Sequence, residues 1–153
     1  MGLFIEDLLN LGNLIDAELE IELSPEILRK AYTDLEFEIK DGLMLIKGKK
    51  KGFIFSKSYE VRLAEDTNRV KKDRDTGRQY AGLRLLTRSG LEELLKKEGF
   101  YSEGEWLFFD LMPAVVHTET YQKVPKQFKD RLLINRYRLS KDLLKAFFKF
   151  EKG

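Results

Sequence analysis

The sequence predicts an α+β domain, in which a curved, mainly antiparallel sheet packs against two or three helices. A hairpin pattern occurs twice, at 35–46 and 132–150, each with two largely alternating apolar and polar runs around a short polar break. Such alternation is typical of strands that bury one face. With 153 residues, of which 42% are hydrophobic and 35% charged, the chain is long enough for a single domain, 1–153, with its own core.

The N-terminal region combines a helix pattern with a strand pattern. Residues 1–16 carry an apolar stripe at helical spacing, and residues 17–23 alternate between apolar side chains and glutamates. A helix that lies on a membrane surface usually has Lys and Arg on its polar face, whereas this one has acids. We therefore expect a helix that packs on the sheet, followed by a strand with a solvated acidic face.

A second helix and the first hairpin are indicated by their boundary residues. Ser24 is a favourable N-cap and Pro25 a favourable first helical residue, so a helix is expected from there to about residue 32. Asp41-Gly42 is a strong two-residue turn signal. It predicts a hairpin whose second strand, 43–47, ends at a lysine-rich stretch.

The middle of the chain is predicted as strands interrupted by one long loop. Apolar positions at 53–56, 59–64 and 80–87 favour three strands. Residues 65–79 are charged and have Val70 as their only strongly apolar residue, so a long, mobile loop is expected there.

Two segments of the C-terminal half fit more than one structure. Residues 106–116 are the most apolar segment and match either a buried strand or a helix, and Pro113 interrupts both. Residues 142–150 also match both patterns, and a strand is favoured by analogy with the first hairpin. A short helix is expected at 90–98, and a short helix or a turn at 126–131.

Composition excludes several kinds of site and segment. The chain has no Cys and a single His, at position 117, which excludes disulfides, thiolate metal sites and multi-histidine metal sites. No apolar run reaches the roughly 20 residues of a membrane helix. The N-terminus lacks the basic region of a secretory signal. We therefore expect a soluble cytoplasmic protein, with peripheral membrane association left open.

Charge is distributed unevenly along the chain. Residues 1–41 hold 11 acidic and 3 basic side chains, a net charge of −8, whereas the remainder holds 15 and 25, a net charge of +10. The simpler interpretation is that an acidic N-terminal element packs beside basic strands of the same domain. The alternative is a basic surface for an anionic partner, such as phosphate head groups at a membrane or nucleic acid.

No motif indicates catalysis. His117 precedes Glu119, a pair that could act as a general base, but neither a nucleophile elbow nor a cysteine accompanies it. The closely spaced glutamates fall on strand faces that should be solvated, whereas glycosidase carboxyls converge across a cleft. We therefore predict a non-enzymatic protein with no catalytic residue, no metal and no cofactor.

Two sets of side chains are candidates for ligand binding. Basic residues near strand ends could contact an anion, and this set comprises Lys49, Lys50, Lys51, Arg69, Lys71, Lys72 and Arg74. Phenylalanines from the apolar segments could line an apolar pocket or stack on bases, and this set comprises Phe37, Phe53, Phe55, Phe108 and Phe148. The alternatives are solvated turns for the first set and an ordinary packed core for the second.

The order of several short motifs carries a family resemblance. A helix after Ser24-Pro25, the Asp41-Gly42 hairpin, lysine-punctuated strands, and a segment running from Val124-Pro125-Lys126 to Asn135 follow one another. This order resembles the bacterial relatives of tubular lipid-binding (TULIP-like) domains over most of 17–150. The resemblance implies a long curved sheet wrapped around a helix, with a groove for acyl chains, and it assigns no individual binding residue.

The expected function is binding without catalysis. The apolar sheet face would hold a lipid-like ligand or another apolar small molecule, gaining about 0.8 kcal/mol per buried CH₂, with lysines at the rim contacting the head group. One alternative is a nucleic-acid-binding or regulatory module that uses the basic clusters. Another is a structural subunit of a larger assembly, which predicts an exposed apolar patch. The sequence leaves the ligand and the oligomeric state open.

Overall fold

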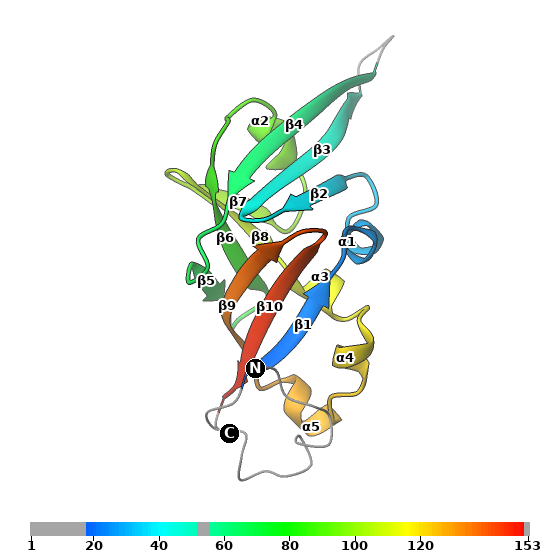
Figure 1. The fold of residues 1–153 in the computed structure, drawn as a ribbon, viewed down its shortest axis with the longest axis vertical. Helices are drawn as coiled ribbons and strands as arrows, with labels where there is room; N and C mark the ends of the chain where they lie inside the picture. The colour runs from blue at the N-terminus through cyan, green and yellow to red at the C-terminus, as the bar shows by residue number, and fades with distance from the viewer. Residues whose placement is uncertain (1–17, 52–55, 152–153) are drawn as a thin grey trace.

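A computed structural model describes residues 18–51 and 56–151 and has an α+β fold (Figure 1). The helix expected at 1–16 and two of the candidate ligand residues, Phe53 and Phe55, lie outside the described residues. The strands are β1 (Leu19–Leu23), β2 (Glu36–Lys40), β3 (Leu43–Lys51), β4 (Ser56–Ala64), β5 (Val70–Lys72), β6 (Gln79–Leu85), β7 (Phe100–Glu103), β8 (Trp106–Asp110), β9 (Leu132–Ser140) and β10 (Leu143–Phe150). The helices are α1 (Pro25–Ala31), α2 (Leu91–Leu94), α3 (Met112–Val115), α4 (Glu119–Gln122) and α5 (Lys126–Lys129).

The strands form two sheets whose neighbouring strands are antiparallel. The smaller sheet has the order β1-β10-β9, and the larger sheet has the order β2-β3-β4-β6-β8-β7, with β5 paired to β6. The two predicted hairpins therefore lie in different sheets, and the strand favoured at 142–150 is confirmed as β10. In Figure 1 the two sheets follow each other along the long axis of the molecule, and α1 and α3 lie beside β1.

Local sequence signals account for the first elements. The Ser24 hydroxyl accepts a hydrogen bond from the backbone N–H of Ile27 at 3.2 Å, and Pro25 occupies the first turn of α1. Gly42 has a φ of 72° in the turn between β2 and β3, where glycine is favoured because it has no Cβ. The predicted strand at 17–23, the helix after it and the first hairpin are confirmed.

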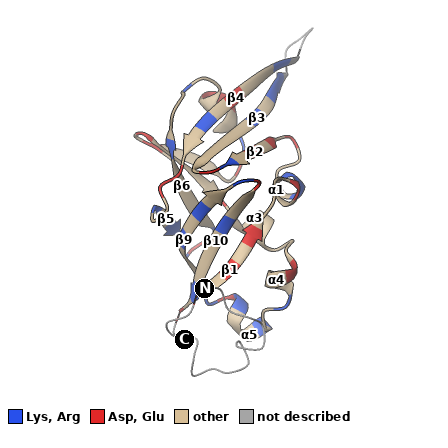
Figure 2. Ribbon diagram, viewed as in Figure 1, with Lys and Arg blue, Asp and Glu red and all other residues tan. Residues whose placement is uncertain are grey.

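The acidic and basic parts of the chain meet in the smaller sheet. Figure 2 shows acidic positions on β1 beside basic positions on β10 and β9. Glu18 lies 3.1 Å from Arg136, and this partner holds the pKa of the Glu18 carboxyl below its usual range. These contacts agree with the simpler interpretation of the charge asymmetry, in which the N-terminal acids face basic strands of the same domain.

The strand after the first hairpin is longer than predicted. β3 continues through the lysine-rich stretch to Lys51, because each of its residues pairs with a residue of β4, ending at Lys51 and Ser56. Lysine is a weak strand former but not an excluded one, and cross-strand pairing decides the outcome here. The strand end predicted at residue 47 is therefore wrong.

The segment predicted as a loop at 65–79 is attached to both sheets. It contains β5, which pairs with β6. Its backbone also bonds to β9, because the carbonyl of Thr67 accepts a hydrogen bond from the N–H of Tyr137 at 2.9 Å. The buried Tyr137 hydroxyl accepts from the N–H of Asp66 at 2.8 Å and donates to the carbonyl of Gly82 at 2.7 Å. The apolar pattern of the sequence does not indicate these contacts, because they are made by backbone atoms rather than by apolar side chains.

The ambiguous segment 106–116 forms both candidate structures in succession. β8 ends at Asp110, and α3 begins at Met112 with a proline in its first turn. The junction is held by the Asp110 carboxylate, whose Oδ1 accepts from the N–H of Gln79 at 3.2 Å and of Met112 at 3.1 Å. Burial raises the pKa of Asp110 above its usual value. β7 and α4 had no prediction, and α2 is shorter than the helix expected at 90–98.

A second polar contact joins the larger sheet to the smaller one. The side-chain amide of Gln79, on β6, donates to the carbonyl of Leu132 at 2.9 Å and accepts from the N–H of Ile134 at 2.6 Å. Gln79 is 3% exposed, so water is unable to replace either bond. Together with Tyr137, this side chain fixes the position of β9 against β6. Among the described residues, no helix combines the length and the apolar character needed to cross a membrane.

Candidate ligand-binding surface

The core accounts for two of the phenylalanines proposed as ligand contacts. Phe37 is 7% exposed and stacks on Phe109, with ring centroids 5.8 Å apart, and Phe148 is fully buried between apolar neighbours. Both side chains therefore belong to the packed interior, which was the ordinary alternative for this set. Phe108 is also buried, at 6% exposed, but it points to the opposite face of the larger sheet, because it alternates along β8 with the core residues Leu107 and Phe109.

The outer face of the larger sheet carries an apolar hollow, which we call the leucine hollow. Leu43 and Leu86 are the most exposed large apolar side chains of the described residues, at 43% and 46%, and both line it. The hollow has a volume of about 270 Å³. Its full lining is Glu38, Lys40, Leu43, Met44, Leu45, Arg62, Leu63 and Leu86.

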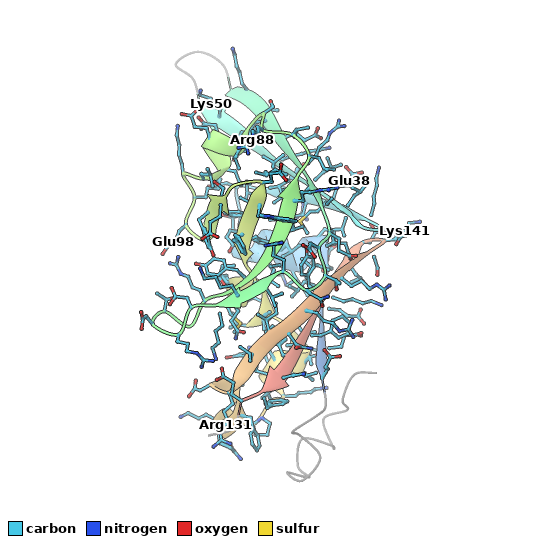
Figure 3. All side chains as sticks on the ribbon, turned by 90° about the vertical axis from the view of Figure 1, so that its left-hand side faces the viewer. Glu38, Lys50, Arg88, Glu98, Arg131 and Lys141 are labelled. Carbon is cyan, nitrogen blue, oxygen red and sulfur yellow. The ribbon has the colours of Figure 1, made fainter. Side chains whose placement is uncertain are left out.

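Basic side chains surround the leucine hollow. Lys40 and Arg62 line it directly. A neighbouring hollow of about 370 Å³ shares Leu86 and is lined by Arg84 and Arg88 as well. Lys40 pairs with Glu38 at 3.8 Å and Arg62 with Glu60 at 3.1 Å, so Arg84 and Arg88 are the two cations of this surface that have no ion pair with a described residue. Figure 3 shows Glu38 and Arg88 in the upper half of the molecule, above β9 and β10.

Further along the same face, cations cover an aromatic cluster. Phe108 and Tyr101 stack with ring centroids 4.9 Å apart, and Lys71 lies 5.5 Å from the centre of the Tyr101 ring. The guanidinium of Arg69 lies 3.7 Å from the centre of the Trp106 ring, which is a cation–π contact. The structure thus brings together Phe108, Arg69 and Lys71 from the two predicted sets, and it adds two aromatic residues that the sequence did not single out.

The remaining basic residues of the 69–78 stretch are engaged in ion pairs. Lys72 and Arg74 both bind Glu151, at 2.8 Å and 2.6 Å, and these cations hold the pKa of Glu151 below its usual range. Arg78 pairs with Glu98. These pairs tie the segment to the C-terminal end of β10 and lower the positive charge that it offers to a ligand.

The lysines of the 47–51 stretch lie on an extended two-stranded ribbon formed by β3 and β4. Figure 2 shows basic positions along this ribbon. Lys50 lies 3.5 Å from Glu93, whereas Lys49 has no ion pair with any described residue. β2 pairs with β3 only as far as Glu36 opposite Lys47, so β3 runs past the start of β2.

An open groove, which we call the ribbon groove, lies beside this part of β3. It has a volume of about 990 Å³. Its lining comes from α1 and the turn after it, from β2, β3 and β4, and from α2 and the two lysines that follow: Arg29, Thr33, Asp34, Leu35, Glu36, Lys47, Gly48, Lys49, Ser58, Tyr59, Glu60, Glu93, Lys96 and Lys97. Of the predicted anion-binding residues whose side chains the structure describes, only Lys49 lines it.

One side of the ribbon groove is formed by a tyrosine laid across a glycine. A Cβ added at Gly48 would lie 2.4 Å from the ring and hydroxyl of Tyr59, so only glycine accommodates this ring position. A Cβ added at Gly90 would lie 3.1 Å from the Cβ of the same tyrosine. Burial, followed by the nearby carboxylates of Glu93 and Asp34, raises the pKa of Tyr59, so its hydroxyl stays protonated near neutral pH.

Residues that could support catalysis or metal binding are dispersed. His117 is exposed in the turn between α3 and α4. The described residues include no group of three or more His, Cys, Asp or Glu arranged to hold a metal ion. In comparisons with known proteins, no family model, no curated protein and no solved structure matches the chain.

Proposed function

We propose that this protein is a non-enzymatic lipid-binding protein that docks at an anionic membrane surface through the leucine hollow. The observation that supports the proposal most directly is the coincidence of exposed leucines and surplus cations on one sheet face. Leu43 and Leu86 would enter the interfacial layer, and the surrounding arginines would contact lipid phosphates. The acyl-chain groove implied by the family resemblance stays a prediction beside this proposal.

The expected strength of binding follows from the exposed surface and the charges. Leu43 and Leu86 keep slightly less than half of their surface exposed, so burying the remainder would contribute roughly 2 kcal/mol. A surplus of two cations near an anionic surface would add about 2 kcal/mol. A total of about 4 kcal/mol corresponds to half-binding near 1 mM lipid, which is weak and reversible.

Lipid fits this surface better than the two alternatives. A subunit of a larger assembly would also expose an apolar patch, but a stable interface buries about 800 Å² per partner, and two half-exposed leucines provide far less. Nucleic acid would rely on the basic clusters, and in the 69–78 stretch most cations already pair with acids. Neither alternative uses the exposed leucines and their basic rim together.

The direct test is sedimentation with vesicles. We expect the full chain to bind vesicles of phosphatidylcholine that contain phosphatidylserine, and to bind pure phosphatidylcholine roughly 30-fold less, because the loss of about 2 kcal/mol has that effect. The double variant Leu43→Asn, Leu86→Asn should lose a similar factor. Arg84→Gln should weaken binding about 5-fold, and Arg138→Gln, an exposed position on β9, is the control that should not.

Three results would contradict the proposal. The first is the absence of sedimentation with either vesicle. The second is an equal effect of Arg84→Gln and Arg138→Gln, which would indicate net charge alone rather than this face. The third is a concentration-dependent dimer in light scattering that disappears in the Leu43→Asn, Leu86→Asn variant, because that result would assign the hollow to an assembly.

A further inference from the structure

The ribbon groove has features that the proposed lipid surface does not use. It lies along the edge of β3 that extends beyond Glu36, the first residue of β2. Residues 48–51 of β3 pair with β4 on one side and have no partner strand on the other within the described residues. A strand edge of four residues spans about 13 Å and presents backbone N–H and C=O groups that an added strand can bond.

We propose that the ribbon groove binds an extended peptide segment of a partner protein, which adds to the edge of β3 and carries acidic residues at alternate positions. In β-strand addition, backbone hydrogen bonds provide affinity and alternate side chains provide specificity. Asp34 and Lys97, which pair at 3.5 Å, also line this groove. An added strand would continue the sheet in the direction that β2 leaves uncovered.

The preference for acidic residues follows from the outer face of the ribbon. Lys47 and Lys49 lie on that face, two residues apart along β3. Glu38 of β2 lies 3.7 Å from Lys47, which is an example of an acid on a neighbouring strand that pairs with a lysine of β3. Lys49 and Arg29 have no acidic partner among the described residues, and an acid on the added strand would lie within reach of Lys49.

The other face of the added strand would meet Tyr59. The Tyr59 ring lies over Gly48 on the inner face of the ribbon, and an apolar side chain opposite Gly48 would pack against it. The partner segment is therefore expected to alternate acidic and apolar residues. Polyphosphate is a poorer occupant, because it has no backbone N–H groups to donate to the free edge of β3.

The test uses the full chain and fluorescein-labelled peptides that alternate valine with glutamate, with binding read by anisotropy. Lys49→Glu should weaken binding about tenfold, because a favourable cross-strand pair becomes a like-charge pair. A peptide that alternates valine with lysine should bind Lys49→Glu better than it binds the unchanged protein. Lys57→Glu is the matched control: it changes the same charge on the same ribbon, but on β4 opposite Lys50 rather than on the edge of β3.

A peptide of the same charge with a central proline distinguishes strand addition from charge attraction, since proline removes a backbone donor. Equal binding of this peptide would overturn the proposal. So would equal effects of Lys49→Glu and Lys57→Glu, or no binding of the alternating peptide to the unchanged protein. Unfolding curves of both variants should match the unchanged protein, because both lysines are exposed.

Discussion

Removing the hydroxyl of Tyr137 should destabilise the fold more than its size suggests. The Tyr137→Phe variant loses one oxygen atom that both donates to the carbonyl of Gly82 and accepts from the N–H of Asp66. Gly82 is buried, so its carbonyl would lose its partner without access to water, at a cost of about 1–3 kcal/mol. Asp66 is half-buried, and its N–H would recover part of its bond from water. The expected loss is about 2–3 kcal/mol.

The chain supplies a matched control for this experiment. Tyr101 also has a buried hydroxyl oxygen, but that oxygen has no hydrogen-bond partner in the described part of the chain. Tyr101→Phe removes the same atom, and the neighbouring Lys71 ammonium is exposed and keeps its contact with water, so the free energy of unfolding should change by less than about 0.5 kcal/mol or rise. Both variants can be compared by urea unfolding, followed by far-ultraviolet circular dichroism.

The comparison separates hydrogen bonding from the loss of volume. The urea dependence of the free energy should be the same in both variants, because the exposed surface on unfolding hardly changes. Equal losses in Tyr137→Phe and Tyr101→Phe would refute the reasoning, since they would mean that partner atoms at Gly82 and Asp66 do not matter. A loss below about 0.5 kcal/mol in Tyr137→Phe would refute it as well.

Three further predictions concern other buried or paired groups. Burial raises the pKa of Asp110 above 3.8, so the contribution of its protonated form to stability is complete below pH 3.8 and is lost as pH rises through the raised pKa. Asp110→Asn keeps the Oδ1 acceptor and does not titrate, so the stability of this variant relative to the unchanged protein should increase over the same pH range. Unfolding at several pH values measures this difference, and a difference that does not change with pH would contradict the prediction. Gly48→Ala should destabilise by about 1–3 kcal/mol because its Cβ meets the Tyr59 ring, and the cost should shrink in a Tyr59→Ala background. Glu151→Gln should cost about 1 kcal/mol near neutral pH, and the cost should vanish as pH falls through the lowered pKa of Glu151.

The fold was predictable where the signal is local. Ser24-Pro25 and Asp41-Gly42 fix a cap and a turn through their own backbone preferences, and the structure confirms both. Lys51 was predicted to follow the end of a strand, because lysine-rich stretches are usually solvated turns. The structure places it in β3, because its backbone pairs with Ser56 of β4. The same limit applies at 106–116, where periodicity allowed a strand or a helix and the chain forms one after the other.

The candidate surfaces depend on contacts that sequence spacing does not reveal. Leu86 falls within the strand predicted at 80–87 and directly follows β6 in the structure, and nothing in its sequence neighbours shows that it joins Leu43, which is distant in the chain. The ribbon groove arises because β3 is longer than β2, a difference in register between strands rather than a motif. Phe37 and Phe108 looked alike in the sequence and both are buried, at 7% and 6% exposed, but the sequence did not show that they lie on opposite faces of the larger sheet.

The contacts of Gln79 and Tyr137 imply an uneven tolerance to mutation. Apart from a long bond from Gln79 to the Met112 sulfur at 3.8 Å, both side chains bond main-chain atoms, at Leu132, Ile134, Gly82 and Asp66. Every amino acid except proline has the same main-chain donor and acceptor, so these bonds between the sheets exclude only proline, and only at positions 66 and 134, whose N–H groups donate. In a saturation library selected for folding, we expect the side-chain partner of each contact to tolerate fewer replacements than the main-chain partner. Positions 79 and 137 should accept few replacements, while positions 132 and 134 should accept various apolar residues.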